Sequence, residues 1–590
     1  MPVTIEPRQR RVAALLAAAL GAMLVALAGY LVYILIVGSE RLSAIAYDQQ
    51  HMRVPIQASR GNILDSRLRV LAGSVETRSV FADPKCIRDL GDAATRVGRI
   101  LSIAPEEVLR KLTAKHPDER GGRFVWLARR VSPETAEAIE RLNLRGIAMM
   151  SEGVRHYPNG SLASHVLGCV GAEEQGLDGL EGLFDDRLRG CDGEAMVLAD
   201  RSRKPIWTEA GQYTPAVDGQ QLVLTIDATI QAAAEAAITE ARQKFRAASA
   251  SAIVMDPRTG AILAMANVPT FDPNRYADFP VDSRRNRCVT DTFPPGSSCK
   301  PFVASGALEA GVVRFGEVIY CENGYWAAAK LHDAGHSYGN LTFEQGIEKS
   351  SNIMMGKLGV RLGNARLYHC LQAFGFGHRT GVWLPGESSG VVFPLNKWTR
   401  LSTTRVAFGQ EFAATPLQMM TAFAAIANRG KLVRPKILRG VLDSRGQTVE
   451  DLSDAEVVGQ AISEKTARDM IDRALVGVVE EGTGTACKIP GFRIFGKTGT
   501  AQKIDPETRT VSHTRFMGSF LAGAPAQNPQ MVIVVMVNEP DKSIGYYGGT
   551  VAAPAAKKIL EQALPYLGVS PTETVTGKPI THLVRQGVRD

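Results

Sequence analysis

The sequence predicts an α+β protein in which a single N-terminal transmembrane helix precedes two folded domains. Three observations predict it: one long apolar run near the N-terminus, two apolar strands on either side of a Pro/Gly turn, and an order of elements in the second half that suits a sheet flanked by helices. That order is helix, hairpin, long helical middle, strands and closing helix. The 590 residues are 45% hydrophobic and 22% charged, which excludes a disordered, collagen-like or coiled-coil chain.

The chain is moderately basic. Its 68 Lys and Arg residues exceed its 60 Asp and Glu residues, giving a formal net charge of +8. The excess is spread along the sequence, so nucleic acid is not indicated as a partner. A mean hydropathy of −0.05 excludes a polytopic membrane protein but leaves room for one span.

The first predicted element is a transmembrane helix over residues 12–37. A helix of this length is about 39 Å long and crosses a hydrocarbon core of about 30 Å. Arg8, Arg10 and Arg11 precede it, so residues 1–11 are expected to be a cytoplasmic tail and the bulk of the chain to be periplasmic. The alternative is a signal peptide cleaved near Ala26-Leu27-Ala28. The apolar run is longer than a signal core of about 7–15 residues, which favours an uncleaved anchor.

Residues 38–220 are predicted to form the first domain. Met52, Val54 and Ile56 alternate as in a short strand, helical patterns cover 105–112 and 133–142, and Pro158-Asn159-Gly160 signals a turn. This half offers no obvious reaction chemistry.

Residues 221–567 are predicted to form the second domain, and the polar, Thr-rich residues 568–590 a flexible tail. Asp227 is a candidate N-cap for a helix. The predicted elements are a strand over 222–227, a helix over 228–245, a hairpin of 251–255 with 261–268, strands over 516–522 and 531–537, and a helix over 552–567.

Neither the cysteines nor the histidines indicate a metal site. The eight cysteines form no C-x-x-C pair, and most are expected to be buried or free thiols. His332 and His336 have the spacing of a helical zinc pair, but Gly335 between them favours a loop. We therefore expect neither a metal nor an organic cofactor.

The first motif with reaction chemistry is Ser297-Ser298-Cys299-Lys300. Gly and Pro break the preceding segment, and a helix opening at Ser297 would bring its hydroxyl and the Lys300 amine onto one face. A serine is a nucleophile when an adjacent base takes its proton. Lys300 can be that base if burial and a second cation lower its pKa from about 10.4 towards 7.

Two later segments complete an S-x-x-K, S-x-N, K-T-G set in the order of serine acyl-enzymes. Ser350 can pass a proton to a departing amine, and Asn352 can hold a substrate amide. Lys497, on a strand-like stretch over 492–495, can lower the pKa of Lys300 and attract a carboxylate.

The residues after Lys497 are assigned to the substrate. The Thr498 and Thr500 hydroxyls can bind its carboxylate, and Gly499 lets its backbone lie along the strand edge. Backbone N–H groups of Ser297 and Thr500 are the candidate oxyanion hole.

With these motifs the chain resembles the class B penicillin-binding proteins, and the division-type branch more closely than the elongation-type branch. The resemblance covers nearly the whole length after the anchor. It rests on the catalytic set and on further segments: Arg60-Gly61-x-Ile63-x-Asp65, Leu71-Ala72, Tyr157-Pro158, Leu162-Ala163, His165 to Gly168, Gly179-Leu180-Glu181, Ala407 to Gln410, Thr415 to Gln418 and Ala425 to Asn428.

The resemblance implies an elongated pedestal (dimerisation-like) domain and a penicillin-binding/serine β-lactamase-like transpeptidase domain. It implies a D,D-transpeptidase of the inner membrane that cross-links peptidoglycan stem peptides in septal or lateral wall synthesis, with release of D-Ala and inhibition by β-lactams. The implied protein partners are a membrane glycan polymerase and division or elongation complex proteins. Five positions depart from the family pattern without removing a catalytic group: Ser66, Leu68, Ser298, Cys299 and Glu411.

Three other functions compete with this one. Gly491 to Thr498 fits the P-loop pattern, but its Phe-Arg-Ile-Phe spacers favour a strand, which argues against an NTPase. A membrane-anchored serine β-lactamase or β-lactam sensor would need a carboxylate to activate water, and Glu387 is the candidate, although Leu384-Pro385-Gly386-Glu387 is typical of a turn. The third alternative is a non-catalytic scaffold for a glycan polymerase.

Overall fold

The computed structural model describes residues 6–36, 43, 51–114, 125–199, 205–333, 335–505, 508 and 510–571. The chain divides into two compact units. The first comprises Met1–Ala58, Glu76–Val154 and Cys191–Asp218, and the second comprises Ser59–Val75, Arg155–Gly190 and Gly219–Asp590. Most of the predicted tail over 568–590 lies outside the described residues, as does Val37 at the end of the predicted span.

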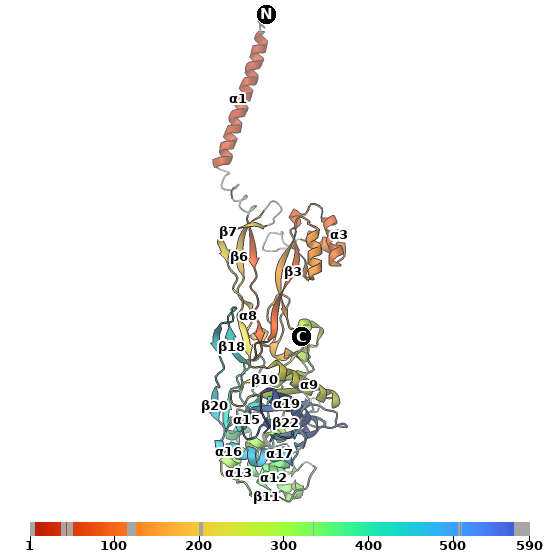
Figure 1. Cartoon of the computed structure of the whole chain (residues 1–590), viewed down its shortest axis with the longest axis vertical. Helices are drawn as coiled ribbons and strands as arrows, with labels where there is room; N and C mark the ends of the chain where they lie inside the picture. The colour runs from red at the N-terminus through yellow and green to blue at the C-terminus, as the bar shows by residue number, and fades with distance from the viewer. Residues whose placement is uncertain are drawn as a thin grey trace. The chain divides into compact units, whose positions relative to one another are not determined.

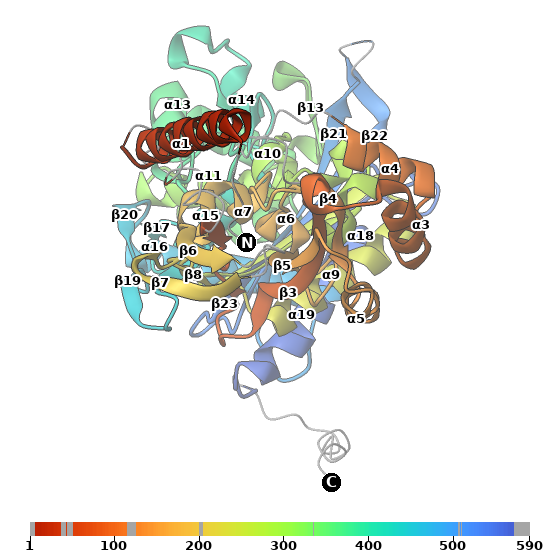
Figure 2. The ribbon, with the colours of Figure 1, turned by 90° about the horizontal axis from the view of Figure 1, so that it is seen from above.

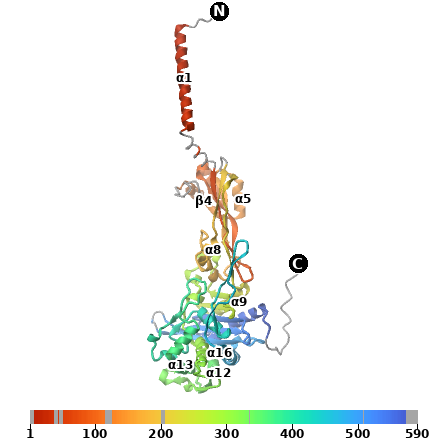
Figure 3. The same cartoon turned by 90° about the vertical axis from the view of Figure 1, so that its left-hand side faces the viewer.

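The predicted membrane span is a helix. Helix α1 covers Pro7–Ile36, 30 residues with no buried side chain, and is drawn in red as one continuous helix (Figures 1 and 3). Its length of about 45 Å exceeds the hydrocarbon thickness of a bilayer. The helix begins five residues before the predicted start because Pro7 is favoured in a first turn and arginine is a good helix former.

The first unit contains two sheets. Strands β1 (His51–Ile56), β6 (Gly193–Ala199) and β7 (Pro205–Thr214) form one antiparallel sheet in the order β1-β6-β7. The part of β3 (Val70–Ala82) from Glu76 onward pairs with β4 (Val125–Val131) and β5 (Ile147–His156). A small hydrophobic core lies beside this second sheet and includes Val80, Val97, Val108, Leu127 and Ile139. Three helices contribute to this core: α3 (Leu90–Leu101), α4 (Pro105–Thr113) and α5 (Pro133–Arg141).

The second unit is built on an antiparallel five-stranded sheet of order β10-β9-β23-β22-β21. The strands are β9 (Ser249–Met255), β10 (Ile262–Val268), β21 (Phe495–Ile504), β22 (Val511–Ala524) and β23 (Met531–Asn538). Figure 2 shows β21 and β22 side by side. β21 is the last strand of the order, so within the described residues one of its edges pairs with no further strand.

Alternate residues of this sheet enter two different cores, as the pleat requires. Ile533 and Val535 of β23 join one core, and Val532 and Val534 join the other. Helices α9 (Ala228–Lys244) and α19 (Ala553–Tyr566) pack together on the first face (Figure 1).

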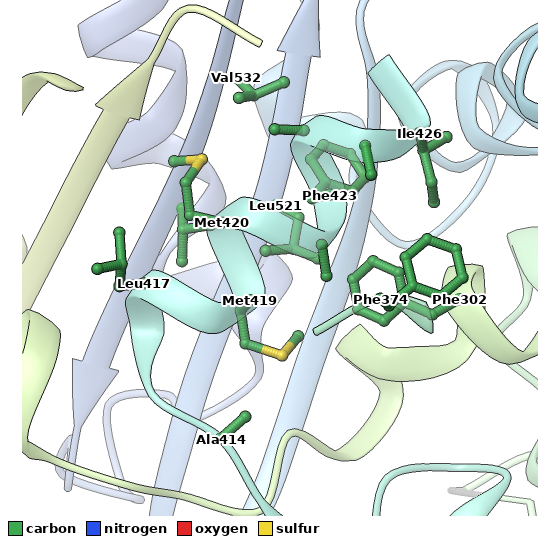
Figure 4. Close-up of a cluster of buried hydrophobic side chains, with 14 of the residues drawn as sticks. Phe302, Phe374, Ala414, Leu417, Met419, Met420, Phe423, Ile426, Leu521 and Val532 are labelled. Carbon is green, nitrogen blue, oxygen red and sulfur yellow. The ribbon is translucent and has the colours of Figure 1, made fainter. Parts of the chain in front are cut away.

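The other face is covered by α11 (Lys300–Glu309) and by α15 (Pro416–Ala427), which is buried along its whole length. Figure 4 shows Leu417, Met420 and Phe423 of α15 lying over Leu521 and Val532 of the sheet. The rings of Phe302 on α11 and Phe374 lie 5.1 Å apart beside them.

Further strands and helices complete the second unit. Its strands are β2 (Ile63–Leu64), β8 (Gln221–Leu224), β11 (Val318–Tyr320), β12 (Tyr325–Trp326), β13 (Leu331–His332), β14 (Asn340–Thr342), β15 (Val391–Val392), β16 (Phe412–Ala413), β17 (Lys431–Val433), β18 (Leu438–Leu442), β19 (Thr448–Asp451) and β20 (Val457–Gln460). Its helices are α6 (Ser164–Leu167), α7 (Gly179–Leu183), α8 (Asp185–Arg189), α10 (Arg287–Thr290), α12 (Phe343–Glu348), α13 (Asn352–Ala373), α14 (Ser402–Val406), α16 (Glu464–Met470), α17 (Val476–Glu480) and α18 (Gly548–Val551), with a 3-10 turn η4 (Gly296–Cys299) before α11.

Most predicted elements of the second unit are present. The helix after Asp227 is α9, and Asp227 caps it by accepting from the N–H groups of Thr229 and Ile230. The hairpin, the two late strands and the closing helix are β9 with β10, β22, β23 and α19. One prediction is displaced: the strand expected over 492–495 begins only at Phe495.

Candidate active site

Ser297 lies in the 3-10 turn η4, which packs against β21. The sequence predicted that Ser297 opens an α-helix, but the α-helix α11 begins three residues later, at Lys300. The Gly296 N–H donates to the Gly409 carbonyl at 2.9 Å, and a Cβ on Gly296 would lie 3.1 Å from the Thr500 carbonyl oxygen. The Ser298 hydroxyl donates to the Pro295 carbonyl at 2.6 Å. These contacts hold the nucleophile candidate beside the K-T-G strand.

The Lys300 ammonium group is fully buried and has three partners. Its Nζ donates to the Ser350 carbonyl at 2.6 Å, to Ser350 Oγ at 3.1 Å and to Asn352 Oδ1 at 2.7 Å. Burial lowers the pKa of Lys300 to about 7, and the negative charge of Asp333 opposes the shift. An amine with this pKa is partly neutral near pH 7 and can therefore act as a base.

Lys497 is also fully buried and reaches the same serine. Its Nζ donates to Ser350 Oγ at 2.9 Å and to the Thr498 carbonyl at 3.1 Å. Burial, followed by repulsion from Lys300, lowers the pKa of Lys497 well below its usual value. The sequence argument had Lys497 lower the pKa of Lys300; burial is the first cause at both lysines, and the repulsion between the two ammonium groups acts in the same direction.

Ser350 occupies a strained position between two helices. Its φ of 58° lies in the left-handed region, which costs a residue other than glycine on the order of 1–3 kcal/mol. It follows α12 and precedes α13, whose N-cap Ser351 accepts from the Met354 N–H. The strained backbone brings the Ser350 hydroxyl within hydrogen-bond distance of both ammonium groups.

The K-T-G-T residues lie on the edge strand β21. The Thr498 and Thr483 hydroxyls share a hydrogen bond of 2.6 Å, and Thr500 Oγ1 accepts from the Gly548 N–H at 3.0 Å. A Cβ on Gly499 would lie 2.2 Å from Ser519 Oγ and 2.9 Å from Ser298 Cβ. Gly499 is therefore needed for close packing of the strand on η4, a reason that the sequence argument did not include.

The structure joins four of the five predicted catalytic side chains directly: Lys300, Ser350, Asn352 and Lys497. Ser297 lies one turn before Lys300, but within the described part of the chain its hydroxyl makes no hydrogen bond. Asn352, expected to hold a substrate amide, uses its Oδ1 for Lys300 and donates from Nδ2 to the His332 carbonyl at 3.0 Å.

The residues behind the competing functions have other roles. Lys497 lies within a strand rather than at the opening of a helix, so Gly491 to Thr498 is not a phosphate-binding loop. The Glu387 carboxylate accepts from the Thr380 N–H and hydroxyl at 2.6 Å each and from the Gly381 N–H at 3.2 Å, so it stabilises a turn.

The candidate zinc pair and the cysteines also lie outside a metal centre. His332 stacks on Tyr325 and His336 on Tyr338, and the described residues contain no group of three His, Cys, Asp or Glu that could hold a metal ion. All eight cysteines are free and six are buried. Burial raises the pKa of Cys299, beside the nucleophile candidate, to about 12.

Comparison with known proteins decides the family. The family model described as the penicillin-binding protein transpeptidase domain matches residues 250–561, and that of the penicillin-binding protein dimerisation domain matches residues 55–224. The chain is a class B penicillin-binding protein. The predicted family and enzyme class, a serine penicillin-binding transpeptidase, are confirmed.

Curated relatives and solved structures agree with this assignment. The penicillin-binding protein is 34% identical to Stage V sporulation protein D of Bacillus subtilis, over 91% of this chain and 83% of that protein. It is 33% identical to the peptidoglycan D,D-transpeptidase FtsI of Escherichia coli, over 92% of this chain and 89% of that protein. These relatives belong to the division-type branch that the motifs favoured.

The fold has close structural relatives. Penicillin-binding protein 3 of Mycobacterium tuberculosis, solved with aztreonam, superposes with a TM-score of 0.68 and 29% identity, covering 88% of this chain and 99% of that one. Penicillin-binding protein 2X of Streptococcus thermophilus gives a TM-score of 0.72 at 25% identity, over 88% of this chain and 81% of that one.

Sequence reasoning missed two residues that shape the site of this penicillin-binding protein. Thr483 pairs with Thr498, and its signal was the Gly482-Thr483-Gly484-Thr485 run. Asp333 contacts the first turn of α13, and it was noticed only as the residue between two histidines. Both contacts join residues 15 to 20 positions apart on different elements, so a local pattern can draw attention to a residue but does not predict its partner.

Proposed function

We propose that this penicillin-binding protein is a peptidoglycan D,D-transpeptidase that cross-links stem peptides through an acyl-enzyme on Ser297. One observation carries the proposal: the buried ammonium groups of Lys497 and of Lys300, which follows Ser297 by one turn, converge on Ser350 Oγ. A base that is partly neutral near pH 7 and a hydroxyl able to relay a proton are the parts that serine acyl transfer needs. Relatives named as peptidoglycan D,D-transpeptidases support the substrate class.

In the acylation step the neutral Lys300 amine takes the proton of the Ser297 hydroxyl, and Oγ bonds to the penultimate D-Ala carbonyl carbon. The C–N bond to terminal D-Ala then breaks. The proton passes from Lys300 through Ser350 Oγ, which contacts both lysines, to the departing amine. In the second step an acceptor amine attacks the ester, loses a proton along the same route, and Ser297 regains its hydroxyl.

Substrate binding is assigned to the edge strand β21. We assign the terminal carboxylate to the Lys497 amine and the Thr498 and Thr500 hydroxyls, which supply hydrogen-bond donors along this strand. Thr500 accepts from Gly548, so its own proton remains available for that carboxylate. The N–H groups of Ser297 and Thr500 are assigned to the oxyanion. A β-lactam would present the same carbonyl and carboxylate, which makes it an inhibitor.

The proposal extends to location and partners. Helix α1 supports a single-pass anchor. We assign residues 1–11 to the cytoplasm, 12–37 to the inner membrane, 38–220 to a periplasmic pedestal, 221–567 to the transpeptidase domain and 568–590 to a tail. The pedestal and the anchor would bind a membrane glycan polymerase and division complex proteins.

Labelling with fluorescent penicillin tests the function, using wild type beside Ser297→Ala and Lys300→Ala. We expect a long-lived adduct on Ser297 in wild type, mapped by mass spectrometry, and none in Ser297→Ala. Rapid release of the adduct would favour a β-lactamase, and labelling of Ser297→Ala would refute the nucleophile. Full growth of cells that carry only Ser297→Ala would favour the scaffold.

A further inference from the structure

Asp333 makes the densest set of hydrogen bonds beside the S-x-N motif. Its carboxylate is 5% exposed and accepts from the Asn352 N–H at 2.6 Å, from the Ile353 N–H at 3.0 Å, and from the Ser351 hydroxyl at 3.0 Å on both oxygens. It therefore binds the opening turn of α13 at three consecutive residues.

These bonds tie two distant segments together. Asp333 follows the short hairpin of β12 and β13, and its own N–H donates to the Gly324 carbonyl at 3.2 Å. The preceding residue, His332, accepts from Asn352 Nδ2 through its carbonyl. Asn352 is thus held by its backbone N–H and by its side-chain amide from one loop, which leaves its Oδ1 directed at Lys300.

Capping of the helix alone does not explain this arrangement. Ser351 already caps α13 by accepting from the Met354 N–H at 3.1 Å, and a neutral side chain could accept the remaining N–H bonds. A buried carboxylate is costly unless opposite charge balances it. The balance is present, because Asp333 acts on the Lys300 ammonium group.

The charged and titratable groups around this pair are few. Lys300 faces Lys497 on β21, Cys299 and Asp333. Asp333 in turn acts on Lys300, Cys321 and Tyr338, and the ammonium group of Lys357 on α13 acts on the same Cys321 thiol. Burial raises the pKa of the Cys321 thiol and of Tyr338 above their usual values, so both stay neutral at physiological pH. Asp333 is then the one anion in this set, beside two buried amines.

We propose that Asp333 is a positioning residue of the acyl-transfer reaction: it fixes Asn352 so that Lys300 is aimed at Ser350, and its charge offsets the buried ammonium group of Lys300. This inference rests on the proposed function of the same site. It assigns Asp333 no contact with substrate; it acts through Asn352 and Lys300.

The variant that separates charge from geometry is Asp333→Asn. An asparagine keeps an oxygen for the N–H groups of Asn352 and Ile353 but removes the negative charge. Without that charge the neutral amine of Lys300 is favoured, so the acid limb of the acylation rate should move to lower pH, by roughly 1 pH unit for a nearby charge. Asp333→Ala loses the geometry as well, and its acylation should fall about 100-fold at every pH.

The matched control is Asp227→Asn, which removes the charge of a different buried aspartate, the N-cap of α9. The second-order rate of acylation by fluorescent penicillin is measured from pH 5.5 to 9 on the full chain in detergent, with the melting temperature of each variant. The proposal is supported if the low-pH limb of the acylation rate profile moves to lower pH in Asp333→Asn and stays in place in Asp227→Asn.

A profile of Asp333→Asn that superimposes on that of wild type overturns the proposal, and so does an equal shift in Asp227→Asn. If Asp333→Ala does not fold, the Asp333→Asn profile alone decides. Failure of the proposed function is distinguishable, because wild type itself would then not acylate at Ser297.

Discussion

At the scale of single residues, the site is built from groups that are unfavourable in a folded protein. Lys300 and Lys497 are two fully buried amines that share one hydroxyl, and Ser350 adopts a left-handed conformation. Desolvation of an ammonium group costs several kcal/mol unless the pKa falls. Such groups are retained where chemistry needs a base that is neutral near pH 7.

The buried amine of Lys300 predicts a pH dependence. Because its pKa is about 7, the fraction of neutral base falls as pH drops below 7, and the rate of acylation should fall tenfold per pH unit there and level off above about pH 8. Lys300→Arg, which stays protonated, should acylate roughly 10³-fold more slowly throughout. Stopped-flow acylation from pH 5.5 to 8.5 measures this.

The control for this prediction is Lys436→Arg, since burial also lowers the pKa of Lys436 but its amine donates to the Leu452 and Asp454 carbonyls. Its pH profile should match that of wild type. A wild-type rate independent of pH across this range would contradict the assignment of Lys300 as base.

Gly499 carries a second prediction at this scale. In Gly499→Ala the new methyl group would clash with Ser519 Oγ and Ser298 Cβ, which forces β21 away from η4 and costs about 1–3 kcal/mol. Acylation should fall about 10- to 100-fold and the melting temperature should drop. The control is Gly459→Ala on β20, where a Cβ meets no atom within 4 Å; equal effects of the two variants would refute the packing argument.

At the scale of elements, the sequence predicted those helices and strands whose formation depends on residues close together in the chain. The apolar runs of β9, β10 and β23 and the capped, Ala-rich α9 were predicted correctly from the sequence because each is governed by neighbours along the chain. The 3-10 turn at Ser297 was not predicted from the sequence, because it depends on the packing of η4 against β21, a distant element. Asp333 was missed for the same reason: its partners lie about 20 residues away on another element.

The cap of α15 predicts a stability effect without a change in chemistry. Thr415 Oγ1 accepts from the Gln418 N–H at 3.1 Å and Gln418 Oε1 accepts from the Thr415 N–H at 2.9 Å, both buried. Thr415→Ala should lower the free energy of unfolding by about 1–2 kcal/mol. Thr415→Ser retains a capping hydroxyl and should therefore retain most of this stabilisation. Thermal unfolding of the full chain in detergent compares them; if the alanine variant is as stable as the serine variant, the capping box contributes nothing.

At the scale of the whole molecule, the sequence predicted contiguous domains, whereas the two compact units interleave along the chain. Ser59–Val75 and Arg155–Gly190 belong to the second unit, with Arg60 and Arg155 both bonded to the buried Glu181. Local sequence patterns could not predict this, because Arg60 and Arg155 lie 121 and 26 positions from Glu181. The boundaries over 38–220 and 221–567 therefore stay predictions.

Membrane orientation can be tested with a native thiol. Cys191 is the exposed cysteine of the chain, and the Arg-rich N-terminus predicts that everything after α1 is periplasmic. A membrane-impermeant maleimide should then label the chain in intact spheroplasts. Cys191→Ser should remove most of that label, since the other seven cysteines are buried or half-buried. In a Cys191→Ser background, Gln9→Cys, before the apolar run, should react only after the membrane is permeabilised. The reverse pattern, with Gln9→Cys accessible from outside and Cys191 protected, would overturn the orientation and place the acyl-transfer site away from its substrate.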